Sequence, residues 1–497
     1  MSLSIEEMRS FCKRKGLLYP SGDIYGGIKG FFDYGPYGSE LKRRLVSRWW
    51  QSFVRDQEDI VGIDGSIITN PKVWEASGHV DSFSDLILES EDGTYQIRAD
   101  HFLEDELGGD YDGVSADRVD ELVEEHELQA PNGESFKPCQ PFNLMFETRV
   151  GPKQSSSNQA FLRPETAQLI FANFKHVREN ARLSLPFGIA QTGKAFRNEI
   201  SPRNFVFRSR EFEQLEIEHF AHPEEDETPD VSFDEPITVY DAEAQTGDGE
   251  QESLLLDDLV GDSMTPWIAA YAAEHLEWLS GLGVSLDNLR LREHLDDELA
   301  HYSSTCWDVE YKFPFGWKEL MGLADRGDFD LSHHIEHSGE ALSVHDQDRD
   351  EHVVPEVACE PSLGVDRLFL AVLYDGYEED GRGNAVLSLH PSLAPNTVAV
   401  FPLVGNDEDL VEKAESVYDA VDESFDAYWD AKGSIGRRYA RQDELGTPYC
   451  VTVDFDSMDD DAVTIRFRDS TEQERVSVDE LPDRLGELIA EYPEGQV

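Results

Sequence analysis

The chain has 497 residues, enough for two or three domains with ample apolar cores, and it carries 103 acidic against 42 basic residues, a formal net charge of −61. No apolar run reaches the roughly 18 residues of a membrane span, and no basic segment precedes a long apolar run near the N-terminus, so we expect neither a membrane protein nor a signal peptide. The five cysteines are scattered and form no C-x-x-C pair, which argues against a disulfide framework and suits a reducing cytoplasm.

The acidic charge has two interpretations. It can belong to an ordinary, highly soluble acidic protein, or it can be an adaptation to molar salt, where charge repulsion is screened within about 3 Å. The chain has 13 Lys and 29 Arg, and the acids are spread along it rather than gathered in one tail. We favour the adaptation to salt.

The first half of the chain contains an acidic segment and a helix entry. Residues 100–135 are rich in acids and are predicted to be an insertion with a helix near 114–127. In "FLRPETAQLIFANF" (161–174), Pro164 and Thr166 mark a loop that enters a helix. Glu165 precedes this helix, and taken alone it is interpreted as a residue that favours the helix N-terminus.

Residues 196–220, "FRNEISPRNFVFRSREFEQLEIEHF", are predicted to form two strands joined by a turn at 201–204. Side chains two apart on a strand share a face, so Arg197 and Glu199 share a face of the first strand, and Arg208, Phe212 and Glu216 share a face of the second. Arginine binds phosphate, an aromatic or guanidinium face stacks on adenine, and a carboxylate binds an ammonium group. The hairpin therefore has the groups needed for ATP and an amine-bearing substrate, and a salt-bridged surface ribbon is the alternative.

The distribution of basic residues leaves room for a nucleic-acid partner. Such acidity ordinarily argues against one. However, residues 194–210 hold five basic residues and one acid, and "GRRYAR" at 436–441 adds another basic spot. We therefore expect local basic surfaces on an acidic body.

No Lys or Arg occurs between Arg210 and Arg290, and residues 224–262 contain 15 acids. We predict an acidic insertion within about 222–300, of which 222–262 is exposed and partly disordered. The segment 264–282 has the apolar periodicity of a helix.

The run "GWKELMGLADRGDFDLSHH" (316–334) places Glu319 and Arg326 among glycines. His333, His334 and His337 invite a zinc interpretation, but their spacing matches no catalytic zinc motif, so no zinc is expected.

In "EPSLGVDRLFLAVL" (360–373) a buried helix is predicted, with Asp366 and Arg367 in its first turn. An arginine there opposes the helix dipole and needs an anionic partner, for which a structural salt bridge is the simpler interpretation. The chain contains no Walker A loop, G-x-S-x-G elbow or Rossmann fingerprint.

A linker is predicted around residues 391–396. Beyond it, strands at "TVAVFPLV", "YCVTVDFD" and "AVTIRFRD" alternate with helices near 407–422 and 478–491, which indicates an α/β domain of about 100 residues.

Taken together, these segments resemble the three signature motifs of class II aminoacyl-tRNA synthetases. "GPYGSELKRRLVSRWW" (35–50) resembles the first, a helix that leads to the dimer interface. "FRNE" with Arg208, Phe212 and Glu216 resembles the second, and "PSLGVDRLFLAVL" the third. Finer matches, such as "DIYGGIKGFFDYGPYG" (23–38), "VWEASGHVDSF" (73–83) and "RPETAQ" (163–168), are similar to glycyl-tRNA synthetases of the dimeric, archaeal and eukaryotic-like type.

The resemblance implies an α+β fold with two parts. Residues 1–393 would form the catalytic domain, an antiparallel sheet flanked by helices, and residues 394–497 an α/β anticodon-binding domain. The implied protein is a cytoplasmic homodimer that uses ATP, glycine, tRNA(Gly) and Mg²⁺.

The resemblance also implies site residues. Arg197 would hold the α-phosphate and Arg208 the γ-phosphate of ATP, while Phe212 and Arg367 would sandwich the adenine and Glu199 would accept its amine. The implied ATP site comprises Arg197, Asn198, Glu199, Phe207, Arg208, Phe212, Glu319, Leu320 and Arg367, with Arg197, Arg208 and Arg367 as catalytic groups.

For glycine, Glu165 would receive the ammonium group and Arg326 the carboxylate, while Glu216, Glu360 and Ser362 would crowd the Cα. The implied glycine and adenylate site comprises Arg98, Glu165, Gln214, Glu216, Arg326, Glu360 and Ser362. Glu319 and Glu360 are the carboxylates implied near Mg²⁺.

Two departures from the family pattern stand out. Leu169 replaces the glycine that usually follows "RPETAQ", which we expect to affect helix packing only. The segment 129–140 keeps one cysteine where many relatives have a short cysteine-rich element, so we expect no metal there. A non-catalytic relative that binds nucleic acid, and a synthetase for threonine, proline or histidine, are the alternatives.

Overall fold

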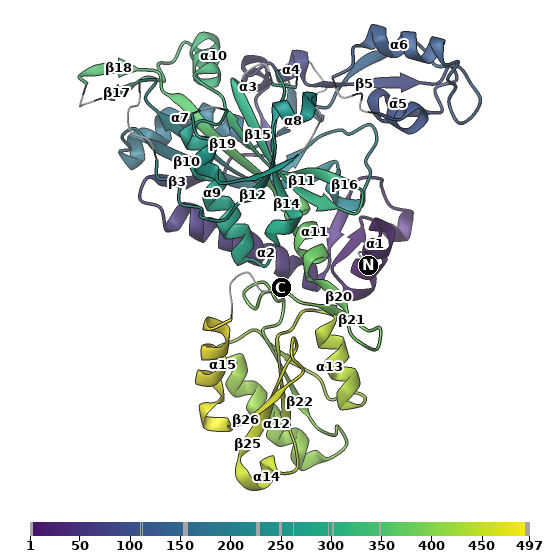
Figure 1. Ribbon diagram of the computed structural model, residues 1–497, viewed down its shortest axis with the longest axis vertical. Coiled ribbons are helices and arrows are strands. Elements are labelled where there is room, and N and C mark those ends of the chain that lie inside the picture. The colour runs from purple at the N-terminus through teal and green to yellow at the C-terminus, as the bar shows by residue number, and fades with distance from the viewer. Residues whose placement is uncertain are drawn as a thin grey trace.

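The computed structural model describes residues 3–109, 111, 113–152, 158–224, 229–247, 251–261, 263–296, 298–300, 303–346 and 349–492. Its centre is a nine-stranded sheet (Figure 1). Neighbouring strands are antiparallel except for the parallel pairs β12–β14 and β10–β3. In spatial order the strands are β13 (Glu252–Leu254), β12 (Ile237–Tyr240), β14 (Leu289–Glu293), β15 (Thr305–Phe313), β16 (Gly316–Asp325), β19 (Glu356–Gly364), β11 (Glu211–Ala221), β10 (Phe187–Phe196) and β3 (Ile60–Ile63).

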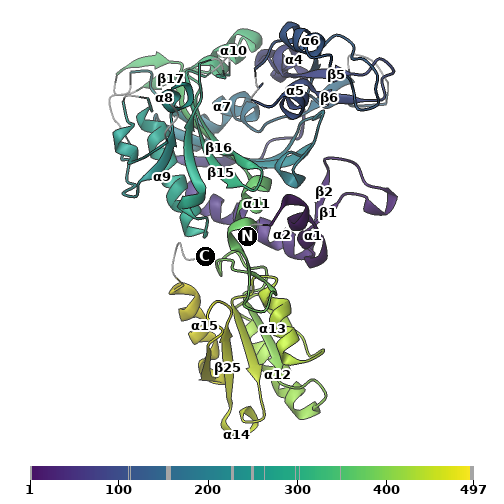
Figure 2. The ribbon, with the colours of Figure 1, turned by 45° about the vertical axis from the view of Figure 1, so that its right-hand side comes forward.

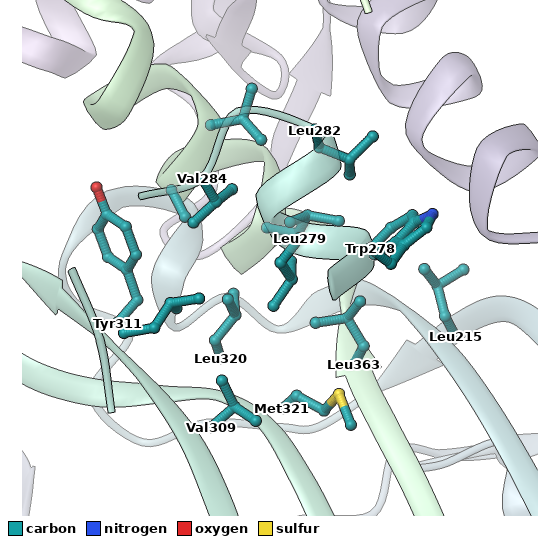
Figure 3. Close-up of a cluster of buried hydrophobic side chains, with 14 of the residues drawn as sticks. Leu215, Trp278, Leu279, Leu282, Val284, Val309, Tyr311, Leu320, Met321 and Leu363 are labelled. Atoms are coloured by element: carbon teal, nitrogen blue, oxygen red, sulfur yellow. The ribbon is translucent and has the colours of Figure 1, made fainter. Parts of the chain in front are cut away.

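One face of this sheet is apolar. Leu215 on β11, Met321 on β16 and Leu363 on β19 are fully buried there. They pack against the helix α9 (Pro266–Gly281), which contributes Trp278 and Leu279 (Figure 3). The predicted helix over 264–282 is confirmed, and the burial of this face follows from the alternation of side chains along each strand.

The opposite face carries polar side chains, and α7 (Ala167–Ala181) and α10 (Phe329–Ser338) pack at the end of that face near β10 and β3. A second apolar cluster forms there from Phe171 and Phe174 of α7, Ile189 of β10 and Phe220 of β11. This cluster fixes α7, and therefore the loop that precedes it, against the sheet.

The N-terminal segment packs beside the sheet and ends in the helix that corresponds to the first motif. Its elements are α1 (Ile5–Lys15), β1 (Leu18–Pro20), η1 (Asp23–Tyr25), β2 (Phe32–Tyr34), α2 (Pro36–Trp50) and the π-helical η2 (Gln51–Arg55). Short elements follow: β4 (Ile68–Thr69), α3 (Pro71–Ala76), α4 (His79–Ser82), β8 (Glu147–Arg149) and β9 (Gln159–Leu162).

Residues 84–143 form a small unit of their own at one end of the molecule (Figure 1). Two helices pack on a three-stranded sheet around Leu88, Phe102 and Leu103. The predicted helix near 114–127 is confirmed as α6. The elements are β5 (Ser84–Glu89), β6 (Gln96–Arg98), α5 (Ala99–Leu107), α6 (Ala116–Glu125) and β7 (Gln140–Asn143).

The prediction that 222–262 is an exposed insertion is wrong for part of that segment. Within it, β12 and β13 join the central sheet, and Ile237 and Val239 are buried. The alternating pattern of "ITVY" supplies this burial despite the surrounding acids. The other elements of this region are α8 (Ala242–Thr246), η5 (Leu256–Asp258), η6 (Leu286–Asn288), β17 (Val344–Asp346) and β18 (Glu351–Val353).

After α11 (Val365–Gly376) and the hairpin β20 (Tyr377–Glu379) and β21 (Ala385–Leu387), the chain enters a separate C-terminal unit (Figure 1). Its sheet has the order β23-β22-β24-β25-β26 and its own apolar core. The predicted α/β alternation is confirmed by β22 (Val398–Pro402), α12 (Glu408–Asp422), β23 (Ala427–Trp429), α13 (Ile435–Asp443), β24 (Tyr449–Val453), α14 (Ser457–Asp460), β25 (Ala462–Phe467), β26 (Gln473–Ser477), η7 (Val478–Glu480) and α15 (Leu481–Ala490).

Polar contacts join the C-terminal unit to the rest of the chain. Lys15 pairs with Glu444, and Arg44 pairs with Asp426. Arg468 donates a hydrogen bond to the carbonyl of Leu389 at 2.8 Å. The α+β class predicted from the sequence, with an antiparallel-rich sheet and a C-terminal α/β unit, is therefore confirmed. Among the described residues, every helix is too short or too polar to span a bilayer.

Candidate active site

A cleft of about 240 Å³ opens on the polar face of the central sheet. Its walls come from β11, β16, β19, the loop 197–210 and the first turn of α11. Most of the predicted ATP residues line it: Arg197, Glu199, Phe207, Arg208, Phe212, Glu319 and Arg367. Gln214 and Ser362, from the predicted glycine set, also line it.

The loop 197–210 replaces part of the predicted hairpin. β10 ends at Phe196 and β11 begins at Glu211, so the arginines between them do not lie on strands. Asn204 and Phe205 adopt the left-handed backbone region, with φ of 57° and 58°, and Phe205 begins the short 3₁₀ turn η4 (Phe205–Phe207). These conformations interrupt the ladder.

The prediction that Arg197 and Glu199 share one strand face, and that Arg208 shares another with Phe212, is therefore wrong. The alternation does hold along β11 for Phe212, Gln214 and Glu216, which belong to the regular strand. The loop instead lets the two arginines approach the cleft from its rim.

Arg197 is held between aromatic rings. Its guanidinium carbon lies 5.3 Å from the ring centroid of Phe83 and 5.3 Å from that of Phe212. Its Nε donates a hydrogen bond to the carbonyl of Pro164 at 3.1 Å. These contacts fix a planar cation at the cleft before any anion arrives.

Arg208 lies between an acid and a neutral imidazole. Its Nε is 3.0 Å from Glu199 Oε2, and its Nη1 is 2.9 Å from His101 Nε2. Burial, together with the charges of Arg203 and Arg208, lowers the pKa of His101 to about 2. His101 is therefore uncharged and accepts a hydrogen bond from Arg208. Arg203 itself pairs with Glu104 at 3.3 Å, so α5 of the inserted unit contacts the loop twice.

Arg367 has the anionic partner that its place in α11 requires. Its Nη1 lies 2.9 Å from Glu319 Oε2 and donates to the Glu319 carbonyl at 2.9 Å. The Arg367 charge lowers the pKa of Glu319. The guanidinium carbon lies 4.5 Å from the Phe207 ring centroid, so this flat pair forms a second wall of the cleft.

Beside the cleft, three side chains hold Glu216, which is 2% exposed on β11. Ser362 Oγ donates to Glu216 Oε1 at 2.8 Å, and Gln214 Nε2 donates to the same oxygen at 3.2 Å. The Thr166 hydroxyl donates to Oε2. Burial and the nearby charge of Glu165 raise the pKa of Glu216.

Glu165 stays ionised although it is buried. Burial opposes ionisation, but His79, Arg326 and Arg197 together hold the pKa of Glu165 below its usual range. Its Oε2 lies 3.3 Å from His79 Nε2, and Gln168 donates to Oε1 at 3.2 Å. The predicted helix entry is confirmed, since α7 starts at Ala167, yet Glu165 contacts side chains of the site rather than serving only the helix N-terminus.

Arg326 is almost fully buried and bridges two carboxylates. Its Nε and Nη2 donate to Asp330 at 2.7 and 3.0 Å, and its Nη1 donates to both oxygens of Glu360 at 3.0 and 2.9 Å. Burial and the nearby acids raise the pKa of Glu360, whereas its bidentate pairing with Arg326 opposes this effect and favours the ionised form. The arrangement fixes Glu360 beside Ser362, two residues along β19.

Some predicted residues lie elsewhere or offer only backbone groups. Leu320 is the extra residue of a β-bulge, because Val309 pairs with Met321 and Glu310 with Glu319. Its side chain points into the core (Figure 3), so only its backbone can face a ligand. Arg98, on β6, pairs with Asp100 at 2.7 Å, and the Asn198 N–H donates to the Leu144 carbonyl at 2.7 Å.

The two carboxylates expected near Mg²⁺ are not brought together. Glu360 lies opposite Ala324 on β16, five residues from Glu319 along the same strand. Because Leu320 is bulged out, about four strand steps separate Glu319 from Ala324, or roughly 13 Å between Cα atoms at about 3.3 Å per residue, so the register does not place the two carboxylates at one point. Glu319, exposed at the rim, has the oxygen donors that Mg²⁺ prefers.

His333 and His334, two of the histidines considered for zinc, contact different polar groups of the protein. His334 Nε2 contacts Gln168 Oε1 at 3.1 Å, and His333 Nδ1 contacts the Ala76 carbonyl at 3.2 Å. A different set, His294, Cys306 and Asp308, has donor atoms within 4.8 Å of one another. Although burial lowers it, the pKa of His294 is raised to about 11 by Asp308 and Cys306, so an imidazolium and a carboxylate pair there at 2.9 Å.

Sequence reasoning missed several residues that shape the site. His79 and Gln168 lie within quoted motifs, "VWEASGHVDSF" and "RPETAQ", but were assigned no role. His101, Phe83 and Asp330 contact site arginines from the inserted unit, the segment before it and α10.

Two further expectations concern packing. Leu169 is buried against Gly65, where an added Cβ would lie 2.7 Å from its Cδ1. This contact packs α7 against the segment that follows β3, and the effect of Leu169 on helix packing stays a prediction. The basic spot at 436–441 is not wholly exposed, because Arg438 is fully buried and donates to the carbonyls of Pro402, Leu403 and Asp430.

Comparison with known proteins gives consistent matches along the whole chain. Residues 397–488 match the family model described as an anticodon binding domain. The chain is 42% identical over 501 residues to the glycine–tRNA ligase of Staphylococcus aureus strain JH9, covering 98% of this chain and 99% of that protein. The proteins of that name from strains Newman and MW2 give the same identity and coverage.

Proposed function

Because the chain belongs to the glycine–tRNA ligases and ligates glycine to tRNA, we propose that its cleft binds ATP and glycine side by side and forms glycyl-adenylate. One observation carries this proposal. A cleft lined by Arg197, Arg208 and Arg367 continues directly into a row of buried groups headed by Glu216 and Ser362. Phosphates need fixed cations, and a small amine needs carboxylates.

In the ATP half, Arg197 holds the α-phosphate and Arg208 the γ-phosphate. Adenine enters between Phe212 and Arg367, and Glu199 accepts its exocyclic amine. The supporting geometry is the fixation of each cation by a ring, a carbonyl or a carboxylate, because preorganised charges need no rearrangement when charge develops. Mg²⁺ fits at Glu319, where it would neutralise phosphate charge when bound.

In the glycine half, ionised Glu165 receives the ammonium group. Arg326 provides the positive charge for the carboxylate, held by Asp330 and Glu360. Glu216, Glu360 and Ser362 leave no volume for a substrate side chain. A methyl group placed there would also desolvate charge, which adds to the 1–3 kcal/mol that a methyl contact alone discriminates.

The reaction has two steps. A carboxylate oxygen of glycine attacks the α-phosphorus of ATP, forming glycyl-adenylate as pyrophosphate leaves. A ribose hydroxyl of the terminal adenosine of tRNA then attacks the glycyl carbonyl, and AMP leaves. No enzyme nucleophile is needed, since alignment of the reactants and arginine charge lower the barrier.

Amino-acid-dependent exchange of pyrophosphate into ATP tests this proposal. We expect exchange with glycine and not with alanine, serine or threonine, measured in high KCl. Exchange with another amino acid would contradict the glycine assignment. No exchange with any amino acid, together with retained tRNA binding, would favour a non-catalytic nucleic-acid-binding relative.

The two parts of the chain have different proposed roles. We assign residues 1–393 to catalysis and residues 394–497 to anticodon binding, supported by the separate sheet and core of the C-terminal unit. A cytoplasmic location suits the five cysteines, all of which are free thiols.

The loop between β1 and β2 supports a homodimer. Ile24, Tyr25 and Ile28 are 88%, 90% and 65% exposed on it, and the loop projects from the body (Figure 2). Such clustered apolar exposure is typical of an interface. Replacing Tyr25 by aspartate is expected to shift the protein from dimer to monomer in sedimentation velocity, with Asp33→Asn as a control. If the Tyr25→Asp and Asp33→Asn variants both sediment as dimers, this loop is not the dimer interface.

The net charge of −61 supports a working environment of molar salt. In dilute buffer the repulsion among unscreened carboxylates opposes the compact state. We expect the protein to lose its far-UV circular dichroism signal and its exchange activity when KCl is dialysed away, and to keep both in molar KCl. A protein that stays folded and active in dilute buffer would show that its acidity is not a salt requirement.

A further inference from the structure

Glu218 is a buried acid next to the glycine pocket that has no role in the reaction described above. It lies on β11, fully buried, and neither of its carboxylate oxygens accepts a hydrogen bond from a donor among the described residues. Because side chains two apart share a face, Glu218 points to the same side of the sheet as Glu216.

The strand register places Glu218 between an acid and an apolar side chain. Glu216 pairs with Ser362 and His219 with Cys359, so Glu218 lies opposite Glu360 on β19. On its other side Glu218 pairs with Ile189 of β10, which is fully buried. Directly opposed Cβ atoms lie about 4.5–5.5 Å apart, within reach of a hydrogen bond between the two carboxyl groups.

The surroundings of Glu218 require it to be a neutral carboxylic acid. The charged groups that act on it are Glu360, Glu216 and Asp330, all acids, and the single cation Arg326. Arg326 already donates to Asp330 and Glu360. An unpaired buried carboxylate costs far more than a protonated one. Burial, followed by the Glu360 charge, raises the pKa of Glu218 well above its usual value.

We infer that Glu218 is a positioning residue for glycine selection, which closes the pocket floor as a neutral acid and donates its hydroxyl hydrogen to Glu360. This inference rests on the proposed function. Arg326 binds the Glu360 carboxylate from one side, and Glu218 binds it from the other side. The Glu360 side chain therefore cannot rotate away when a substrate with a methyl side chain enters. Glycine is selected because the fixed Glu360 side chain leaves no room for a methyl group.

The test uses two substitutions of similar size that differ in the donor. Glu218→Gln keeps a neutral hydrogen-bond donor, whereas Glu218→Met fills the space beside Ile189 without one. In pyrophosphate exchange we expect E218Q to keep kcat/KM for glycine within threefold of wild type. We expect E218M to raise KM for glycine at least tenfold, with a smaller change in kcat, and to lower the glycine-to-alanine ratio of kcat/KM at least tenfold.

Ile217→Val on the same strand is the matched control, because its side chain enters the apolar core on the opposite face. It is expected to leave KM and discrimination unchanged. Equal kinetics for E218M and wild type would overturn the inference, as would loss of activity in folded E218Q, which would mean that an ionised Glu218 is required. Absence of glycine-dependent exchange by the wild type contradicts the proposed function instead, so the two failures are distinguishable.

Discussion

Replacing Arg197 by alanine is expected to slow glycyl-adenylate formation by a factor of about 10² to 10³. The rings of Phe83 and Phe212 and the carbonyl of Pro164 hold this guanidinium at the cleft, so its charge meets the α-phosphate without reorganisation. Single-turnover adenylate formation, or pyrophosphate exchange at saturating glycine and ATP, measures the effect. Arg197→Lys keeps the charge but loses the planar contact, and we expect an intermediate rate.

Arg118 provides the control for Arg197. It lies on α6 of the inserted unit and makes an exposed pair with Glu121, so its replacement by alanine should leave exchange unchanged. Exchange by R197A within fivefold of wild type would show that Arg197 does not stabilise the transition state. Equal losses in R197A and R118A would point to a general effect on folding.

Replacing Arg326 by methionine is expected to lower the free energy of unfolding by about 3–5 kcal/mol and to abolish glycine-dependent exchange. The guanidinium is 1% exposed, and its loss leaves Asp330 and Glu360 buried without their cation. Urea unfolding in molar KCl, followed by circular dichroism, measures the stability.

A combined variant separates the two effects of Arg326. Arg326→Met with Asp330→Asn and Glu360→Gln removes all three charges, and we expect it to regain most of the lost stability but no exchange. Removal of a complete buried ion network is often neutral, whereas removal of one partner is not. A stable and active R326M would contradict both the structural and the functional role of this residue.

Periodic apolar segments were predictable from the sequence. The helices α9, α11 and α12 and the strands of the C-terminal unit lie where their patterns indicated. Each of these elements buries apolar side chains at regular intervals along the sequence, and such periodicity predicts helices and strands.

The loop 197–210 was not predictable in the same way. Its residues alternate as strand residues do, but the left-handed backbone at Asn204 and Phe205 ends the ladder. Asn204 lies in the turn predicted at 201–204, but no turn signal marks Phe205 or the residues up to Arg210, so the length of the loop was not predictable. The prediction for the acidic segment around β12 was wrong for a different reason. Its many acids indicated an exposed insertion, although Ile237 and Val239 alternate with polar residues as in a half-buried strand.

The site residues that carry charge were found in the motifs, but their partners were not. The contact between His101 and Arg208 joins residues 107 positions apart in the sequence. Such pairs depend on how the elements fold against each other, and no single-sequence pattern contains that information. For Arg367, its position in the first turn of a helix predicted an anionic partner, but the sequence did not identify Glu319 as that partner.

In the proposed function, the contacts between α5 and the loop 197–210 make ATP binding depend on a part of the chain outside the central sheet. His101 and Glu104 support Arg208 and Arg203 from the inserted unit. Excision of residues 84–143 would therefore leave the main sheet whole and yet remove the support of a phosphate-binding cation. The inserted unit is therefore a structural support of the proposed site and not a separate appendage.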